Sequence, residues 1–74
     1  MKCTITEVET KKSYEYSADA FSKRFASFLM LYERHKTDEE HKKILARCEL
    51  AISSNAIFSF ESNGFKFMVL PERR

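Results

Sequence analysis

Residues 56–70, with the sequence AIFSFESNGFKFMVL, constrain the fold of this chain more than any other stretch. Asn63 and Gly64 separate two apolar runs, and these residue types tolerate the positive φ angles that both central positions of a type I′ turn require. Because a two-residue turn fixes the register of a hairpin, Phe60 is predicted to face Phe67. One face of the hairpin is then almost entirely aromatic, so the core is expected to lie against it.

The same register predicts three further cross-strand pairs, which are Phe58 with Val69, Ser62 with Phe65, and Glu61 with Lys66. The charged pair falls on the face opposite the aromatic side chains. Exposed rings on a sheet can stack on nucleic-acid bases. Helices in the same chain must bury their own apolar stripes, however, and we expect them to cover the aromatic face.

Residues 2–9, KCTITEVE, are rich in β-branched side chains and predict a first strand. Ile5 and Val8 fall on opposite faces of such a strand unless a bulge intervenes. A turn and a short second strand are predicted next, at residues 10–12 and 13–17. Only Tyr14 and Tyr16, both on one face, support this second strand.

The first helix is predicted to begin after Ser17, a suitable N-cap, with Asp19 in its first turn. At about 100° per residue, one face collects Ala18, Phe21, Phe25, Phe28, Leu29 and Tyr32. This apolar stripe is expected to be the core face of the helix. The helix is predicted to end near His35 and Lys36, where basic side chains suit the negative end of the helix dipole.

A second helix is predicted to begin after Thr37, which forms a capping box with Glu40. Acidic residues fill its first turn, as the positive end of the helix dipole favours. Its predicted core face consists of His41, Ile44, Leu45, Cys48 and Ile52. The helix should fray near residues 53–55.

These elements predict an α+β fold, a small two-layer sandwich of order β(β)ααββ. Two helices pack on one face of an antiparallel sheet of three or four strands. With 74 residues, the chain is expected to form one domain, residues 1–74. Seven Phe, one Gly and one Pro argue against a disordered chain.

No motif in the sequence indicates catalysis, a metal site or a cofactor. The potential soft metal ligands lack paired spacing, and they are Cys3, His35, His41 and Cys48. Cys48 falls in the middle of a helix on its apolar stripe, which predicts a buried thiol and not a nucleophile. The capping role explains Glu39 and Glu40, and one Gly leaves no phosphate-binding loop. We therefore expect a protein that is not an enzyme.

The charge and the cysteines indicate where the protein works. A formal net charge of +2 is too small to attract nucleic acid or an anionic membrane strongly. Two cysteines are too few for a secreted disulfide scaffold, and neither a secretory leader nor an apolar run of membrane-spanning length is visible. These features predict a cytoplasmic protein that does not associate with membranes.

Several apolar residues are surplus to the predicted core. Met30 lies opposite the stripe of the first helix and Leu31 lies off its edge, while Leu50 lies opposite the stripe of the second helix. Three more share the sheet face away from the aromatic side chains, namely Ile57, Met68 and Leu70. An apolar patch rimmed by charge marks a partner surface, and methionine suits such surfaces.

The leading hypothesis is a small protein that docks on another macromolecule, most simply a protein, as an adaptor or an inhibitor. Compact inhibitors encoded by phages or mobile elements fit this description by size. The residues predicted to contact the partner are Met30, Leu31, Arg34, Lys43, Arg47 and Leu50.

Two alternatives stay open. A nucleic-acid-binding regulator, with a dimer as one form of it, would contact phosphates through Lys23, Arg24, Lys42, Lys43 and Arg47. A homodimer would bring the surplus apolar residues together across a two-fold axis.

Overall fold

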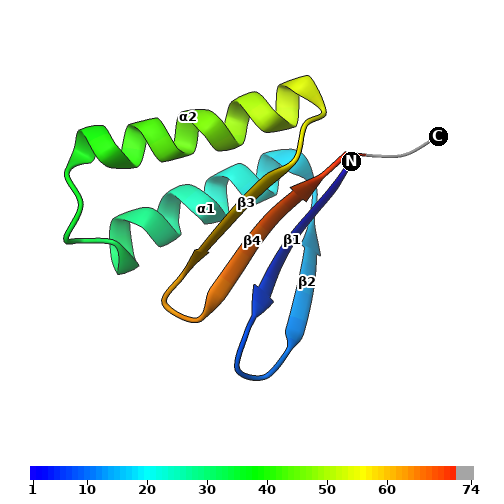
Figure 1. Cartoon of the computed structure of the whole chain (residues 1–74), viewed down its shortest axis with the longest axis horizontal. Coiled ribbons are helices and arrows are strands. Elements are labelled where there is room, and N and C mark those ends of the chain that lie inside the picture. The colour runs from blue at the N-terminus through cyan, green and yellow to red at the C-terminus, as the bar shows by residue number, and fades with distance from the viewer. Residues whose placement is uncertain (72–74) are drawn as a thin grey trace.

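A computed structural model describes residues 1–71 and shows the order ββααββ (Figure 1). The strands are β1 (Lys2–Glu7), β2 (Lys12–Tyr16), β3 (Phe58–Ser62) and β4 (Phe65–Leu70). The helices are α1 (Ala18–Tyr32) and α2 (Asp38–Ser54). The predicted α+β sandwich is confirmed. The short second strand, predicted at residues 13–17, is present as Lys12–Tyr16.

The sheet has four strands in the order β2-β1-β4-β3, and every neighbouring pair is antiparallel. The first and last strands of the chain therefore pair at the centre of the sheet, and β2 and β3 form its edges. Figure 1 shows α1 and α2 side by side on one side of this sheet. α1 packs over β1 and β2, whereas α2 packs over β3 and β4.

The C-terminal hairpin has the predicted register. Phe60 pairs with Phe67, and the three other predicted pairs are also present. Asn63 and Gly64 have φ angles of 49° and 79°, as a type I′ turn requires. β1 ends at Glu7. Val8 therefore lies beyond the strand predicted to include it, and the alternation of β1 needs no bulge.

Aromatic side chains fill the space between the helices and the sheet. Phe25 is fully buried, and its ring meets Phe58, Phe60 and Phe67 edge-on at centroid distances of 5.5, 5.3 and 5.1 Å. Such edge-to-face contacts add to the free energy gained from burial alone. The predicted core stripe of α1 is confirmed except at Tyr32, whose surface is 54% exposed.

α1 ends three residues earlier than predicted. Its last residue is Tyr32, and Glu33 leaves the helix with φ −110° and ψ 42°. This backbone turn places the Glu33 side chain in the interior, where it is 1% exposed. His35 and Lys36 therefore lie beyond the helix and pair with the Glu33 carboxylate instead of capping α1.

Both predicted N-caps are present. The Ser17 hydroxyl accepts a hydrogen bond from the Ala20 amide at 3.3 Å, and the Thr37 hydroxyl accepts one from the Glu40 amide at 3.2 Å. α2 ends at Ser54, followed by Asn55 in the left-handed conformation. Such a residue is a common helix terminator.

Candidate functional site

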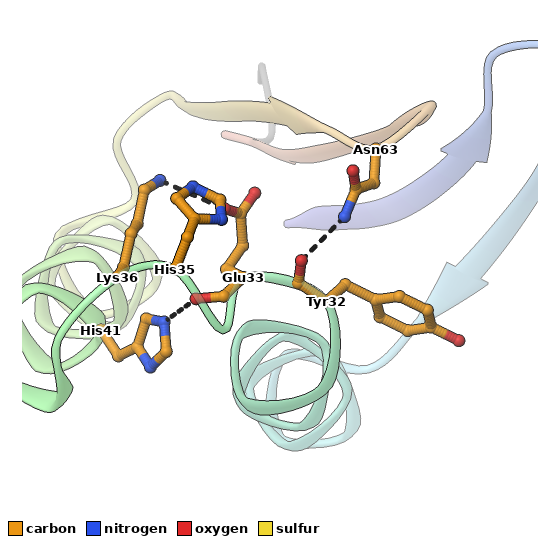
Figure 2. Close-up of polar contacts among 6 residues, drawn as sticks. All are labelled: Tyr32, Glu33, His35, Lys36, His41 and Asn63. Carbon is orange, nitrogen blue, oxygen red and sulfur yellow. Dashed lines mark hydrogen bonds and ion pairs between the residues drawn. The ribbon is translucent and has the colours of Figure 1, made fainter.

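A polar cluster joins the turn between the helices to the sheet (Figure 2). Glu33 Oε2 lies 3.1 Å from His35 Nε2 and 3.6 Å from Lys36 Nζ. The Lys36 ammonium also lies 5.2 Å from the centroid of the Phe60 ring, a cation–π contact. Glu33 Oε1 is buried without a hydrogen-bond partner among residues 1–71.

The backbone at this turn is held by side chains from two other elements. Asn63 Nδ2 of the hairpin donates to the Tyr32 carbonyl at 2.8 Å, and His41 Nε2 of α2 lies 2.6 Å from the Glu33 carbonyl (Figure 2). The last carbonyl groups of a helix need partners from outside it. These contacts hold the turn after α1 against the hairpin and α2.

Three grooves are lined by residues of α1. One of them, about 400 Å³ in volume, lies at Ala18, Asp19, Ser22, Glu49 and Ile52 and contains none of the large exposed hydrophobic residues of the described chain. The other two do contain such residues. The interhelical groove, about 300 Å³ in volume, is lined by Ala26, Leu29, Met30, Asp38, His41, Lys42 and Leu45. Of the large hydrophobic side chains that the described residues expose, it contains only Met30. It is otherwise the seam between two packed helices.

The second groove lies between α1 and the β2 edge, and we call it the tyrosine groove. Its walls are formed by Tyr14 and the half-buried Tyr16 from β2 and by the exposed Arg24, Leu31 and Tyr32 from α1. The core rings of Phe28, Phe65 and Phe67 line its inner side. Its volume is about 290 Å³.

The tyrosine groove exists because β2 is an edge strand. The register places Tyr16 opposite Cys3 and Tyr14 opposite Ile5, so both tyrosines point toward the helix layer. No element among residues 1–71 lies outside β2 to cover them. Tyr14 is therefore 48% exposed, and Leu31 across the groove is 57% exposed.

The groove combines exposed apolar side chains with one arginine. Three of the seven large exposed hydrophobic residues of the described chain lie here, namely Tyr14, Leu31 and Tyr32. The Arg24 guanidinium lies 6.0 Å from the centroid of the Tyr16 ring and forms no ion pair within residues 1–71. Tyrosine and arginine are enriched among the residues that dominate protein interfaces. The groove therefore offers apolar area together with one positive charge that no carboxylate among residues 1–71 pairs.

The structure distributes the predicted partner-binding residues over several surfaces. Met30 lines the interhelical groove and Leu31 the tyrosine groove, because successive residues of a helix point about 100° apart. Arg34 is exposed in the turn after α1. The remaining three are exposed on the outer side of α2 at helical spacing, namely Lys43, Arg47 and Leu50.

The residues of the nucleic-acid hypothesis are also dispersed. Lys23 pairs with Asp19 at 3.6 Å, and Arg24 lies on Tyr16. Lys42 lines the interhelical groove beside Asp38, and the last two, Lys43 and Arg47, lie on the outer side of α2. These five residues therefore do not share one surface, whereas a protein that follows a phosphate backbone needs its basic residues together.

Sequence reasoning did not place the three tyrosines in a surface groove. Tyr32 belongs to the apolar stripe of α1, and Tyr14 and Tyr16 alternate as core residues do. Which strand lies at the edge decides their exposure, and strand order has no local signal. The sequence pointed to this groove only through Leu31 and Arg24, an apolar and a basic residue that lie near each other off the core stripe of the first helix.

The two cysteines are buried thiols. Cys48 is fully buried, and burial raises its pKa to about 12, with smaller contributions from nearby Cys3 and Glu49. Burial also raises the pKa of Cys3. A reactive cysteine needs a lowered pKa. Neither thiol is therefore suited to nucleophilic chemistry.

This burial predicts a loss of stability in alkaline solution. An unfolded chain ionises Cys48 near pH 9.0, whereas the folded chain keeps it neutral up to about pH 12. The folded state binds more protons between these values, so the free energy of unfolding falls as pH rises, by at most about 1.4 kcal/mol per pH unit. Urea unfolding between pH 7 and 10.5 measures the slope. Cys48→Ala should show a shallower slope, and equal slopes would contradict the prediction.

Comparison with known protein families, with curated proteins and with solved structures finds no match to this chain. Within residues 1–71, no helix is long and apolar enough to cross a membrane. No group of three or more His, Cys, Asp or Glu side chains in the same range is placed to hold a metal ion.

Proposed function

We propose that this chain is a non-enzymatic docking protein that binds a protein partner through the tyrosine groove. The observation that supports it is that Tyr14 of β2 and Leu31 and Tyr32 of α1 expose apolar surface in one concave site. Arg24 lies beside them and forms no ion pair among residues 1–71. A partner side chain entering the groove would bury apolar area against rings that the core already holds rigid. The role is that of an adaptor or an inhibitor, and the two buried free thiols accord with work in a reducing cytoplasm.

The test places a photo-crosslinking phenylalanine analogue at position 31 or at position 30, in the cells from which the gene derives. These neighbours on α1 face different grooves, so position 30 is the matched control. We expect a discrete crosslinked protein from position 31 alone. The crosslinked protein is then purified and its affinity for this chain is measured. Leu31→Glu should weaken that affinity at least about 30-fold, and Met30→Glu should change it little.

Three results would contradict the proposal. They are crosslinking from position 30 alone, no crosslinked protein from either position, and crosslinking to nucleic acid. The last result would favour the nucleic-acid alternative, for which binding must also weaken steeply with added salt.

A further inference from the structure

We infer that the segment recognised by the tyrosine groove is an extended, acidic peptide strand that adds to the free edge of β2. This inference rests on the proposed function and specifies its mode of binding. Strand addition gives affinity through main-chain hydrogen bonds and specificity through pockets for alternate side chains. Both features are present at β2.

The first observation is the open edge itself. β2 pairs with β1 alone, over the continuous register from Lys12 opposite Glu7 to Tyr16 opposite Cys3. About half of the backbone N–H and C=O groups of an edge strand point away from its neighbour. Proteins usually block such edges with proline, a bulge, charged side chains such as lysine, a very short strand or a covering element. β2 is five residues long and has one lysine, Lys12 at its start, which leaves residues 13–16 of the edge without a lysine. β2 has no proline and no bulge, and no described element covers its outer edge.

The second observation is that the groove continues this edge on the helix side of the sheet. An added strand would point every second side chain the same way as Tyr14 and Tyr16, that is, toward Leu31 and Tyr32. The intervening side chains would lie on the other face of the sheet, beside Ser13 and Glu15. The predicted peptide therefore has apolar residues at alternate positions.

The third observation is charge. Arg24 lines the groove, and its guanidinium meets a ring and no carboxylate among residues 1–71. Lys12 lies on the same face as Tyr14, at the end of the strand. Lys12 lies outside the groove lining and opposite Glu7, so Arg24 is the cation that a carboxylate on the peptide would meet in the groove. An acidic segment is thus favoured over a basic one.

The other sheet edge, β3, lacks this arrangement. Its Phe58 and Phe60 side chains contact Phe25 of the core, and Lys36 lies over the Phe60 ring at 5.2 Å. α2 packs over the same strand. A strand added at β3 would find the helix side of the sheet already filled, so β3 serves as an internal control.

The experiment selects binders from a displayed library of random 12-residue peptides on the purified chain. We expect enriched peptides with apolar residues at every second position and at least one Asp or Glu. Binding should fail with Leu31→Glu, weaken about tenfold or more with Arg24→Gln, and persist with Met30→Glu. On binding, hydrogen exchange should slow at β2 amides and stay unchanged at β3. In an added strand, successive peptide N–H groups point alternately toward β2 and away from it. N-methylation of the N–H groups that point toward β2 should therefore weaken binding about tenfold or more, and N-methylation of the intervening ones should change binding little.

The outcomes separate the two proposals. Suppose that peptides bind and that Leu31→Glu abolishes their binding, but that hydrogen exchange at β2 amides does not slow and N-methylation has the same effect at every position. This result would overturn strand addition and leave the proposed function standing. A library without binders, or with binders unaffected by Leu31→Glu, would overturn strand addition, and the crosslinking test would then decide the proposed function separately. Light scattering on the purified chain tests whether a second copy of the chain, and not a peptide, occupies the β2 edge. A dimer lost on Glu15→Pro would show that a second copy occupies the β2 edge, which also overturns the peptide assignment.

Discussion

Phe25→Ala is expected to lower the free energy of unfolding by about 3–5 kcal/mol. The Phe25 ring is fully buried and meets Phe58, Phe60 and Phe67 edge-on, so alanine removes apolar contact with both the β3 and β4 strands. A chain of 74 residues has a total stability of roughly 4–11 kcal/mol. The variant should therefore be marginally folded or unfolded.

Urea unfolding followed by far-ultraviolet circular dichroism measures this loss. Phe25→Leu keeps most of the side-chain volume and should lose about 1–2 kcal/mol less than the alanine variant. Ile57→Ala is the surface control, because Ile57 is 69% exposed, and should stay within about 0.5 kcal/mol of the parent chain. A loss at Phe25→Ala no larger than at Ile57→Ala would mean that the aromatic cluster does not hold the layers together.

The parts of the fold that sequence reasoning predicted are those with local causes. Asn63 and Gly64 determine a turn by their own backbone preferences, and the turn determines which residues pair across the hairpin. Ser17 and Thr37 start the helices through hydrogen bonds to amides three residues away. Such interactions involve neighbours in the chain, so a single sequence contains the information needed to predict them.

The end of α1 had a tertiary cause and was predicted wrongly. Nothing between Tyr32 and Lys36 forbids further helix, and the basic residues there favour it. In the structure, Asn63 and His41, both distant in sequence, bind the Tyr32 and Glu33 carbonyls. These contacts form only after the hairpin and α2 have packed, so no local pattern announces them.

The candidate site could be predicted only in part, for the same reason. Helical periodicity correctly separated Leu31 from the core stripe and placed it near Arg24. It could not show that β2 would lie across from Leu31, or that β2 would be an edge strand with Tyr14 half exposed. Side-chain direction follows from local geometry, but the identity of the facing element follows from the packing of the whole chain.

Lys36→Met is expected to destabilise the fold by about 2–3 kcal/mol, because it leaves the Glu33 carboxylate buried with only His35 beside it. Removing one partner of a fully buried ion pair costs more free energy than this. The expected cost is smaller here because the Lys36 side chain is 26% exposed and His35 still lies beside the carboxylate. Lys23→Met is the matched control. Its partner Asp19 is 88% exposed, and the expected change is within about 0.5 kcal/mol.

Glu33→Leu tests whether the buried charge itself is the source of this cost. It removes the carboxylate and leaves Lys36, whose long side chain can carry its ammonium to solvent. We therefore expect Glu33→Leu to cost less than Lys36→Met in urea unfolding at pH 7. The double variant should regain most of what Lys36→Met alone loses, because an apolar pair can replace a buried ion pair at little cost. If Glu33→Leu proved the more damaging change, the carboxylate would be a net stabiliser of the turn, and the desolvation argument would be wrong.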